Sequence, residues 1–143
     1  MTDPSGCVYI IDSHGLRELM FTQSNSLRSL CHDLLVKGVI AIPNCVWDEI
    51  RDAFDDEADA IAHLISKKIA MNKRYYAGAA QVAEQLNSGF SGSTVDSTTD
   101  YFSASIAMTD GLILITTAEQ MSFYKKVKSC SAVDIKALSA LDG

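Results

Sequence analysis

Four stretches of consecutive apolar residues are spaced along the chain and predict buried β-strands. They cover residues 7–12 (CVYIID), 39–43 (VIAIP), 112–117 (LILITT) and 130–135 (CSAVDI). Short, continuous apolar runs of this kind are typical of strands that a parallel sheet buries on both faces.

Between these runs, apolar residues recur every three or four positions, a spacing that predicts amphipathic helices. Leu27, Leu30 and Leu34 begin one such stripe, and Gly38 follows it where a helix would end. Asn44 stands where the N-cap of the next helix belongs. The predicted helices cover residues 27–38, 45–54, 55–68, 75–86, 100–111 and 121–128. Helices that alternate with strands predict an α/β fold, a three-layer sandwich around a mainly parallel sheet of four to five strands.

The composition narrows the class of protein. The 143 residues are 48% hydrophobic and 21% charged, which suits one compact globular domain over residues 1–143. The formal net charge of −6 excludes a broad basic surface, so any contact with nucleic acid must come from a local patch or from bound cations. No apolar run approaches the roughly 20 residues of a membrane span, and the N-terminus lacks a basic signal-peptide start. We expect a soluble, cytoplasmic protein that does not bind a membrane.

Several common catalytic motifs are absent from the sequence. The four cysteines include no CxxC pair and the three histidines do not flank them at zinc-site spacing, so we expect reduced thiols. No phosphate-binding glycine loop, dinucleotide fingerprint or convincing nucleophile–histidine arrangement is present.

Carboxylates at the ends of predicted strands suggest a metal site. Asp12 directly follows the first apolar run, and Glu119 follows the third run in ITTAE. In open α/β sheets, ligands bind outside the carboxyl ends of the strands. Acids gathered there from separate segments suit a hard divalent cation, Mg²⁺ or Mn²⁺. The structural alternatives are that Asp12 only caps the following helix and that Glu119 is a surface residue in a turn.

Further acids lie on or next to predicted helices. Glu49 flanks the apolar stripe centred on Ile50, where it is the acid of its cluster best placed to face a cleft. Asp100 begins a helix whose inner face carries Ser103 and small residues, and Asp96 lies one turn earlier. Helix capping is the alternative role for Asp96 and Asp100.

The order of these motifs resembles the PIN domain, a family of metal-dependent nucleases that includes VapC-type toxins. The family opens with an apolar strand ending in Asp and Ser or Thr, which YIIDS matches at Asp12 and Ser13. A second strand, a Pro-like turn and a helix with Glu follow, as in IAIPNCVWDEI with Glu49. An Asp-led helix, a Gly and a strand ending in Thr-x-Asp resemble DYFSASIAMTDGLILITTAE, with Asp100 as the matching acid.

Two positions depart from the family pattern. The family usually has a fourth acid in the Thr-x-Asp that ends the strand. An alignment from Asp100 without a gap places Ala118 at that position, whereas an alignment of Thr117 with the motif Thr places Glu119 there. We prefer Glu119, with the shift of one residue absorbed at the strand end. His14 stands where the family often has Asn or Ser.

The resemblance implies an Mg²⁺- or Mn²⁺-dependent endoribonuclease, a hydrolase that cuts RNA phosphodiester bonds. Ser13 and Thr117 would hydrogen-bond the ligand carboxylates or a metal-bound water. The implied catalytic and metal-binding residues are Asp12, Glu49, Asp100 and Glu119, with Asp96 as a supplementary metal ligand. By analogy, the chain is the toxin of a toxin–antitoxin pair, a homodimer inhibited by a small antitoxin protein that covers the cleft.

Other interpretations stay open at this point. A catalytically degenerate PIN fold acting as a binding or scaffolding module would bind no metal tightly and would tolerate Asp12→Asn. A receiver-like phosphoacceptor domain also ends its first strand on Asp, but neither VIAIPN nor LILITT supplies the acceptor Asp. The basic segments at residues 67–74 and 125–128 either steer RNA or are solvated helix ends.

Overall fold

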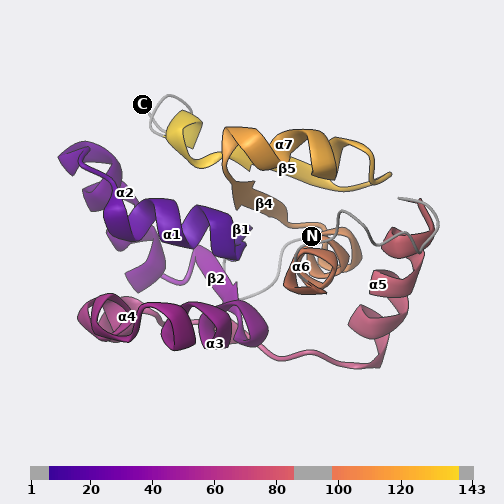
Figure 1. Cartoon of the computed structure of the whole chain (residues 1–143), viewed down its shortest axis with the longest axis horizontal. Helices are drawn as coiled ribbons and strands as arrows, with labels where there is room; N and C mark the ends of the chain where they lie inside the picture. Colours follow the sequence, from indigo (N-terminus) through magenta and orange to yellow (C-terminus); the bar gives the residue numbers. More distant parts are fainter. Residues whose placement is uncertain (1–6, 86–97, 139–143) are drawn as a thin grey trace.

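The strands form one five-stranded, all-parallel sheet in the computed structural model, which describes residues 7–85 and 98–138 (Figure 1). The strand order is β3-β2-β1-β4-β5. The bounds are β1 (Tyr9–Ile11), β2 (Ile40–Pro43), β3 (Lys68–Ile69), β4 (Ile113–Thr116) and β5 (Ser131–Asp134). The predicted α/β sandwich with a mainly parallel sheet is confirmed.

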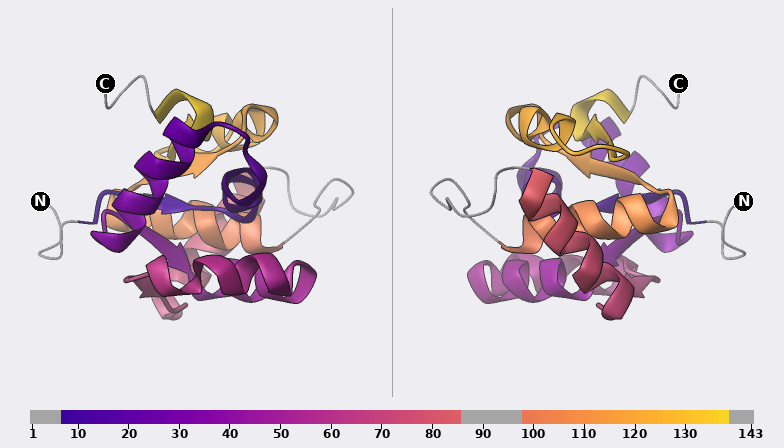
Figure 2. Two further views of the ribbon diagram at one scale, coloured as in Figure 1. Left: turned by 90° about the vertical axis from the view of Figure 1, so that its left-hand side faces the viewer. Right: turned by 90° about the vertical axis from the view of Figure 1, so that its right-hand side faces the viewer.

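Helices cover both faces of this sheet, as parallel strands require. Helices α1 to α4 lie on one side, α5 and α6 lie on the other, and α7 packs along β5 (Figures 1 and 2). The helices are α1 (Ser13–Phe21), α2 (Asn25–Val36), α3 (Asn44–Ala53), α4 (Asp55–Ile61), α5 (Lys73–Gln85), α6 (Thr98–Asp110) and α7 (Ala118–Lys125). Two 3-10 turns, η1 (Ala62–Leu64) and η2 (Ile135–Ala137), complete the described elements. Among them, no helix has the length and apolar character needed to cross a membrane.

Successive residues of β1 enter two different hydrophobic cores. Ile10 packs with Leu114 in the core that α5, α6 and α7 share, whereas Ile11 packs with Ile115 against the first four helices. This alternation follows from the period of two along a strand. Asp12 is the next residue, so its side chain turns toward the side of α6 and α7.

The chain order reverses next to β1. From β1 the chain moves outward through β2 to β3, and it then returns to form β4 on the other side of β1. Such a switch point, at the carboxyl ends of the two neighbouring strands, is where open α/β sheets bind ligands. The first residues after β1 and β4 are Asp12 and Thr117. The fold therefore brings the predicted strand-end residues to one place.

Two local predictions are wrong. Residues 55–68 do not form one helix, because α4 ends at Ile61 and Lys68–Ile69 forms β3, which pairs with β2. Asn44 is the first residue of α3, and the N-cap position is Pro43, which offers no side-chain cap.

Candidate metal centre

Asp12 is fully buried at the end of β1, and its carboxylate accepts three hydrogen bonds. Oδ1 accepts from the backbone N–H of Gly15 at 2.8 Å, which makes Asp12 the N-cap of α1. Oδ2 accepts from the hydroxyls of Thr116 at 2.7 Å and Tyr124 at 2.6 Å. Burial raises the pKa of Asp12, and the hydrogen bonds oppose that rise. Asp12 therefore caps a helix and also holds a buried carboxylate at the switch point.

His14 and Asp100 meet beside Asp12. Nε2 of His14 lies 3.3 Å from Oδ2 of Asp100, and the imidazole is partly exposed while the carboxylate is buried. The hydrogen bond to Asp100 raises the pKa of His14, and burial opposes this effect. The two residues come from the first turns of α1 and α6, so these helix starts converge.

Asp12, His14 and Asp100 together have the composition of a metal centre. One ligand atom from each residue lies within 4.8 Å of the others. Oδ1 of Asp100 and Oγ of Ser103 are buried, and neither has a hydrogen-bond partner among the described residues. A buried polar atom without a partner is costly, so an unpaired carboxylate oxygen in this cluster favours a cation or a bound water.

The other two predicted acids lie outside this cluster. Glu49 is exposed on α3, and its Oε1 accepts a hydrogen bond from Thr99 Oγ1 at 2.7 Å. Because Thr99 precedes Asp100 on α6, this bond ties Glu49 to the helix that carries Asp100. Glu119 is exposed in the first turn of α7. The structure thus brings together two of the four acids and leaves the other two on the surface nearby.

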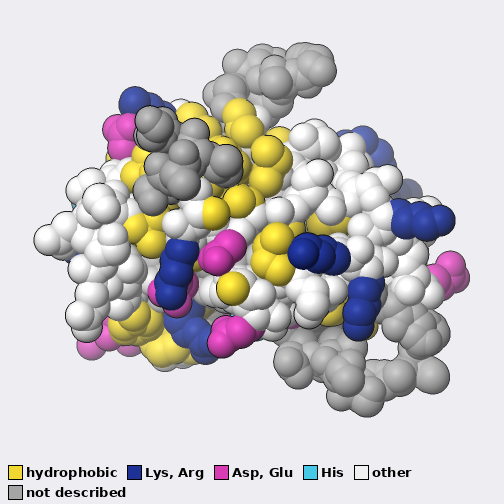
Figure 3. Space-filling view, turned by 90° about the horizontal axis from the view of Figure 1, so that it is seen from above, with side chains coloured by type: hydrophobic (Ala, Val, Ile, Leu, Met, Phe, Trp, Pro, Cys, Tyr) yellow, Lys and Arg dark blue, Asp and Glu magenta, His cyan; other side chains and the backbone are white. Residues whose placement is uncertain are grey.

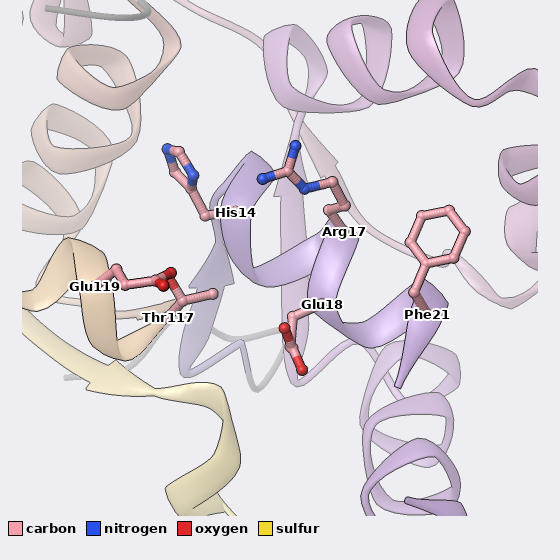
Figure 4. Close-up of a pocket in the computed structure, with 6 residues that line it drawn as sticks. All are labelled: His14, Arg17, Glu18, Phe21, Thr117 and Glu119. Carbon is pink, nitrogen blue, oxygen red and sulfur yellow. The ribbon is translucent and has the colours of Figure 1, made fainter. Parts of the chain in front are cut away.

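A groove runs between α1 and the start of α7 (Figure 4). One hollow of about 240 Å³ adjoins a second of about 190 Å³, and the two share Glu18, Thr117 and Glu119. His14 and Arg17 point to the same side of α1, whereas Glu18 points the other way (Figure 4). Through His14, the groove is continuous with the buried cluster.

The remaining predicted site residues have simple placements. Ser13 is buried as the first residue of α1, and Thr117 is the N-cap residue of α7 and lines the groove. Thr116, one residue earlier, is the threonine that hydrogen-bonds Asp12. Asp96 lies outside the described residues.

The basic segments give little support for an extended nucleic-acid surface. Lys68 lies 5.4 Å from the centre of the Trp47 ring, and Arg74 pairs with Asp110 at 3.7 Å. On the face seen in Figure 3, basic and acidic side chains are interspersed and form no continuous basic surface.

Three residues of the centre were not among the predicted site residues. His14 stands out in the sequence only as a departure from the family pattern, although its position two residues after Asp12 places it in the first turn of the same helix. Thr116 stands with Thr117 and Glu119 at the end of the third apolar run, where Thr117 was preferred, and Tyr124 stands in MSFYKKVK, where no motif marks it as a site residue.

Comparison with known proteins identifies the fold. No protein-family model matches the sequence, and no curated protein matches it. Solved structures do match. VapBC from Salmonella typhimurium, determined bound to DNA, shares 12% identity over 90% of this chain and 98% of its own, with a TM-score of 0.71.

Two further structures agree with this match. VapBC2 from Rickettsia felis, bound to a DNA fragment from its promoter, shares 14% identity over 89% of this chain and 98% of its own, with a TM-score of 0.67. FitAcB from Neisseria gonorrhoeae shares 14% identity over 90% of this chain and 99% of its own, with a TM-score of 0.64. The chain has the PIN-like fold that its motifs predicted.

Proposed function

We propose that the chain is a metal-dependent endoribonuclease that hydrolyses RNA phosphodiester bonds and acts as one PIN-like domain over residues 1–143. The observation that carries this proposal is the cluster of Asp12, His14 and Asp100, whose ligand atoms lie within 4.8 Å of one another. The cluster lies at the switch point of the sheet, where the fold favours ligand binding.

The donor set fits a divalent cation, and it favours Mn²⁺ over Mg²⁺. Mg²⁺ takes oxygen ligands and keeps much of its water, whereas an imidazole beside two carboxylates suits a transition metal better. The unpartnered Oδ1 of Asp100 supports a positive ligand at this point. When bound, such an ion lowers the pKa of water and offsets the negative charge of a phosphodiester.

Each side chain of the centre has a distinct task in this proposal. Asp12 and Asp100 provide the negative charge, and His14 must release its proton before its nitrogen can bind a cation. Glu49 and Glu119 complete the catalytic set from the surface, where Thr99 holds Glu49 beside the start of α6.

The groove beside the cluster suits single-stranded RNA. Arg17 is exposed on the same side of α1 as His14, so its guanidinium can bind a phosphate next to the reacting one. Phe21 is 48% exposed at the end of the same helix and offers a ring face on which a base can stack.

We further propose that the chain is the toxin of a toxin–antitoxin pair in the cytoplasm. The likeness to VapBC structures supports a small antitoxin protein as partner, and the family resemblance supports a homodimer. Light scattering measures the molar mass in solution and should give the mass of two chains. Co-expression with the product of a small neighbouring gene should yield a complex in which RNA cleavage is suppressed.

The decisive experiment is calorimetric titration with Mn²⁺ combined with cleavage of a fluorescent single-stranded RNA. The wild-type chain should bind Mn²⁺ and cut the RNA, and Asp100→Asn should lose both properties. Asp52→Asn, on the exposed face of α3, is the matched control and should retain both. Absence of Mn²⁺ binding in the wild type would contradict the proposal.

One observation favours a second candidate, a binding or scaffolding module without catalysis. Two hydroxyls already hydrogen-bond Oδ2 of the buried Asp12. Glu49 and Glu119 are exposed and lie outside the cluster that contains Asp12. In that case Mn²⁺ would not bind, and Asp12→Asn would leave capture of a protein partner unchanged.

A further inference from the structure

The hydrogen bonds of Asp12 divide its two carboxylate oxygens into different roles. Oδ2 accepts from the hydroxyls of Thr116 and Tyr124, and Oδ1 accepts from the backbone N–H of Gly15. A carboxylate oxygen offers about two lone pairs, so two donors saturate Oδ2 and one donor leaves Oδ1 a free lone pair. Only Oδ1 can then serve a cation without loss of a hydrogen bond.

The three donors also fix the orientation of the carboxylate. Gly15 belongs to α1, Thr116 to β4 and Tyr124 to α7, so the group is held from three separate elements. Both hydroxyl-bearing residues are fully buried. Hydrogen bonds to an ionised acceptor in such surroundings are strong and geometrically selective.

Tyr124 is the donor whose identity is least explained by packing. Its ring lies in the core with α6 and packs edge-on against Phe123, with ring centroids 4.9 Å apart. A phenylalanine would fill the same apolar space but would leave Oδ2 with one donor.

We propose that Tyr124 is a positioning residue of the metal centre: with Thr116, its hydroxyl occupies Oδ2 of Asp12 and so presents Oδ1 for cation binding. This inference rests on the proposed function, because it concerns the same centre. Donors that orient a metal-ligating carboxylate are commonly worth about 10- to 100-fold in metal affinity.

The test compares Tyr124→Phe with Tyr75→Phe by Mn²⁺ calorimetry. The chain offers this control because the Tyr75 hydroxyl also donates to an aspartate, Asp110, at 2.5 Å on α6 and away from the cluster. Tyr124→Phe should weaken Mn²⁺ binding at least about tenfold. Tyr75→Phe should bind Mn²⁺ as the wild type does. A merely structural role would lower the melting temperature of either variant and leave Mn²⁺ affinity unchanged.

Thr116 supplies a second, independent comparison in case Tyr124→Phe does not fold. Thr116→Ser keeps a hydroxyl at Oδ2 and should retain Mn²⁺ affinity, whereas Thr116→Val should weaken Mn²⁺ binding at least about tenfold. Wild-type binding with equal affinity in Tyr124→Phe, or in Thr116→Val if the tyrosine variant does not fold, would overturn this inference and leave the proposed function standing. Failure of the wild type to bind Mn²⁺ would overturn the proposed function itself.

Discussion

Nε2 of His14 lies 3.3 Å from Oδ2 of Asp100, although 86 residues separate the two along the chain. The contact links the first turn of α1 to the first turn of α6 at the carboxyl end of the sheet. It places an imidazole and a carboxylate where a cation would bind, so a proton and a bound metal ion would compete for the same nitrogen. The ionisation of His14 therefore reports on the centre.

His14 and His32 should titrate in a definite order. The hydrogen bond to Asp100 raises the pKa of His14 above 6.5, whereas burial, assisted by Arg28 and His63, lowers that of His32. Imidazole NMR titration in the absence of metal should therefore show His14 losing its proton at a higher pH than His32. Asp100→Asn should move the pKa of His14 downward and leave that of His32 in place. A titration of His14 below that of His32 would contradict the observed contact.

The same contact predicts a pH-dependent term in stability. Because the folded-state pKa of His14 exceeds its unfolded value, protonation stabilises the fold. This contribution is full below about pH 6.5 and is lost as the pH rises through the folded-state pKa. Urea unfolding should show the difference between wild type and His14→Gln shrinking over that interval. If the difference in unfolding free energy between wild type and His14→Gln stays constant from about pH 5.5 to about pH 8.5, protonation of His14 does not stabilise the fold.

Asp12 should lower the stability of the metal-free protein at neutral pH. Burial raises its folded-state pKa above 3.8, so the folded state holds the proton more tightly and loses stability as the pH rises through that folded value. Asp12→Asn removes the buried charge and can still accept from Gly15. We expect a gain of about 1 kcal/mol, or roughly 3 °C in melting temperature, together with loss of Mn²⁺ binding.

Asp52→Asn, on the exposed face of α3, serves as the control for that gain and should change the melting temperature little. A melting temperature of Asp12→Asn well below that of the wild type would show that the three hydrogen bonds outweigh the burial of the charge.

The fold could be predicted where local pattern and tertiary role agree. The apolar runs that became β1, β2 and β4 are buried on both faces, so their composition alone marks them. The two-residue strand Lys68–Ile69 could not be predicted, because a strand so short has no periodicity and exists through its pairing with β2. Lysines are common in the last turn of a helix, so Lys67 and Lys68 suggested a helix end instead.

The candidate site was partly predictable for a similar reason. Asp12 and Asp100 each follow a local signal, a strand end and a helix start, and the parallel sheet brings such positions together. Tyr124 hydrogen-bonds Asp12 although 112 residues separate them in the sequence, so no local sequence pattern could predict this contact. Glu49 and Glu119 were predicted as site acids, and they lie exposed beside the cluster, so their part in it stays a prediction.

A side chain at Gly15 should destabilise the fold, because the first turn of α1 packs directly against β4. A Cβ at this position would lie 2.8 Å from the carbonyl oxygen of Ile115 and 3.0 Å from Cγ1 of Ile11. Relief of these contacts must move the first turn of α1, which holds the N–H bonded to Asp12 and the imidazole of His14. We expect Gly15→Ala to cost about 1–3 kcal/mol and also to weaken Mn²⁺ binding.

Gly111→Ala separates these two effects. Gly111 has φ of 68°, and a Cβ at this position would meet no atom within 4 Å, so alanine there is strained by about 1–2 kcal/mol without touching a neighbour. Chemical denaturation should show both variants destabilised, while calorimetry should show weaker Mn²⁺ binding in Gly15→Ala alone. Equal Mn²⁺ affinity in the two variants would mean that the centre does not depend on the seating of α1 against β4, and that Asp12 is held by Thr116 and Tyr124 without help from the helix it caps.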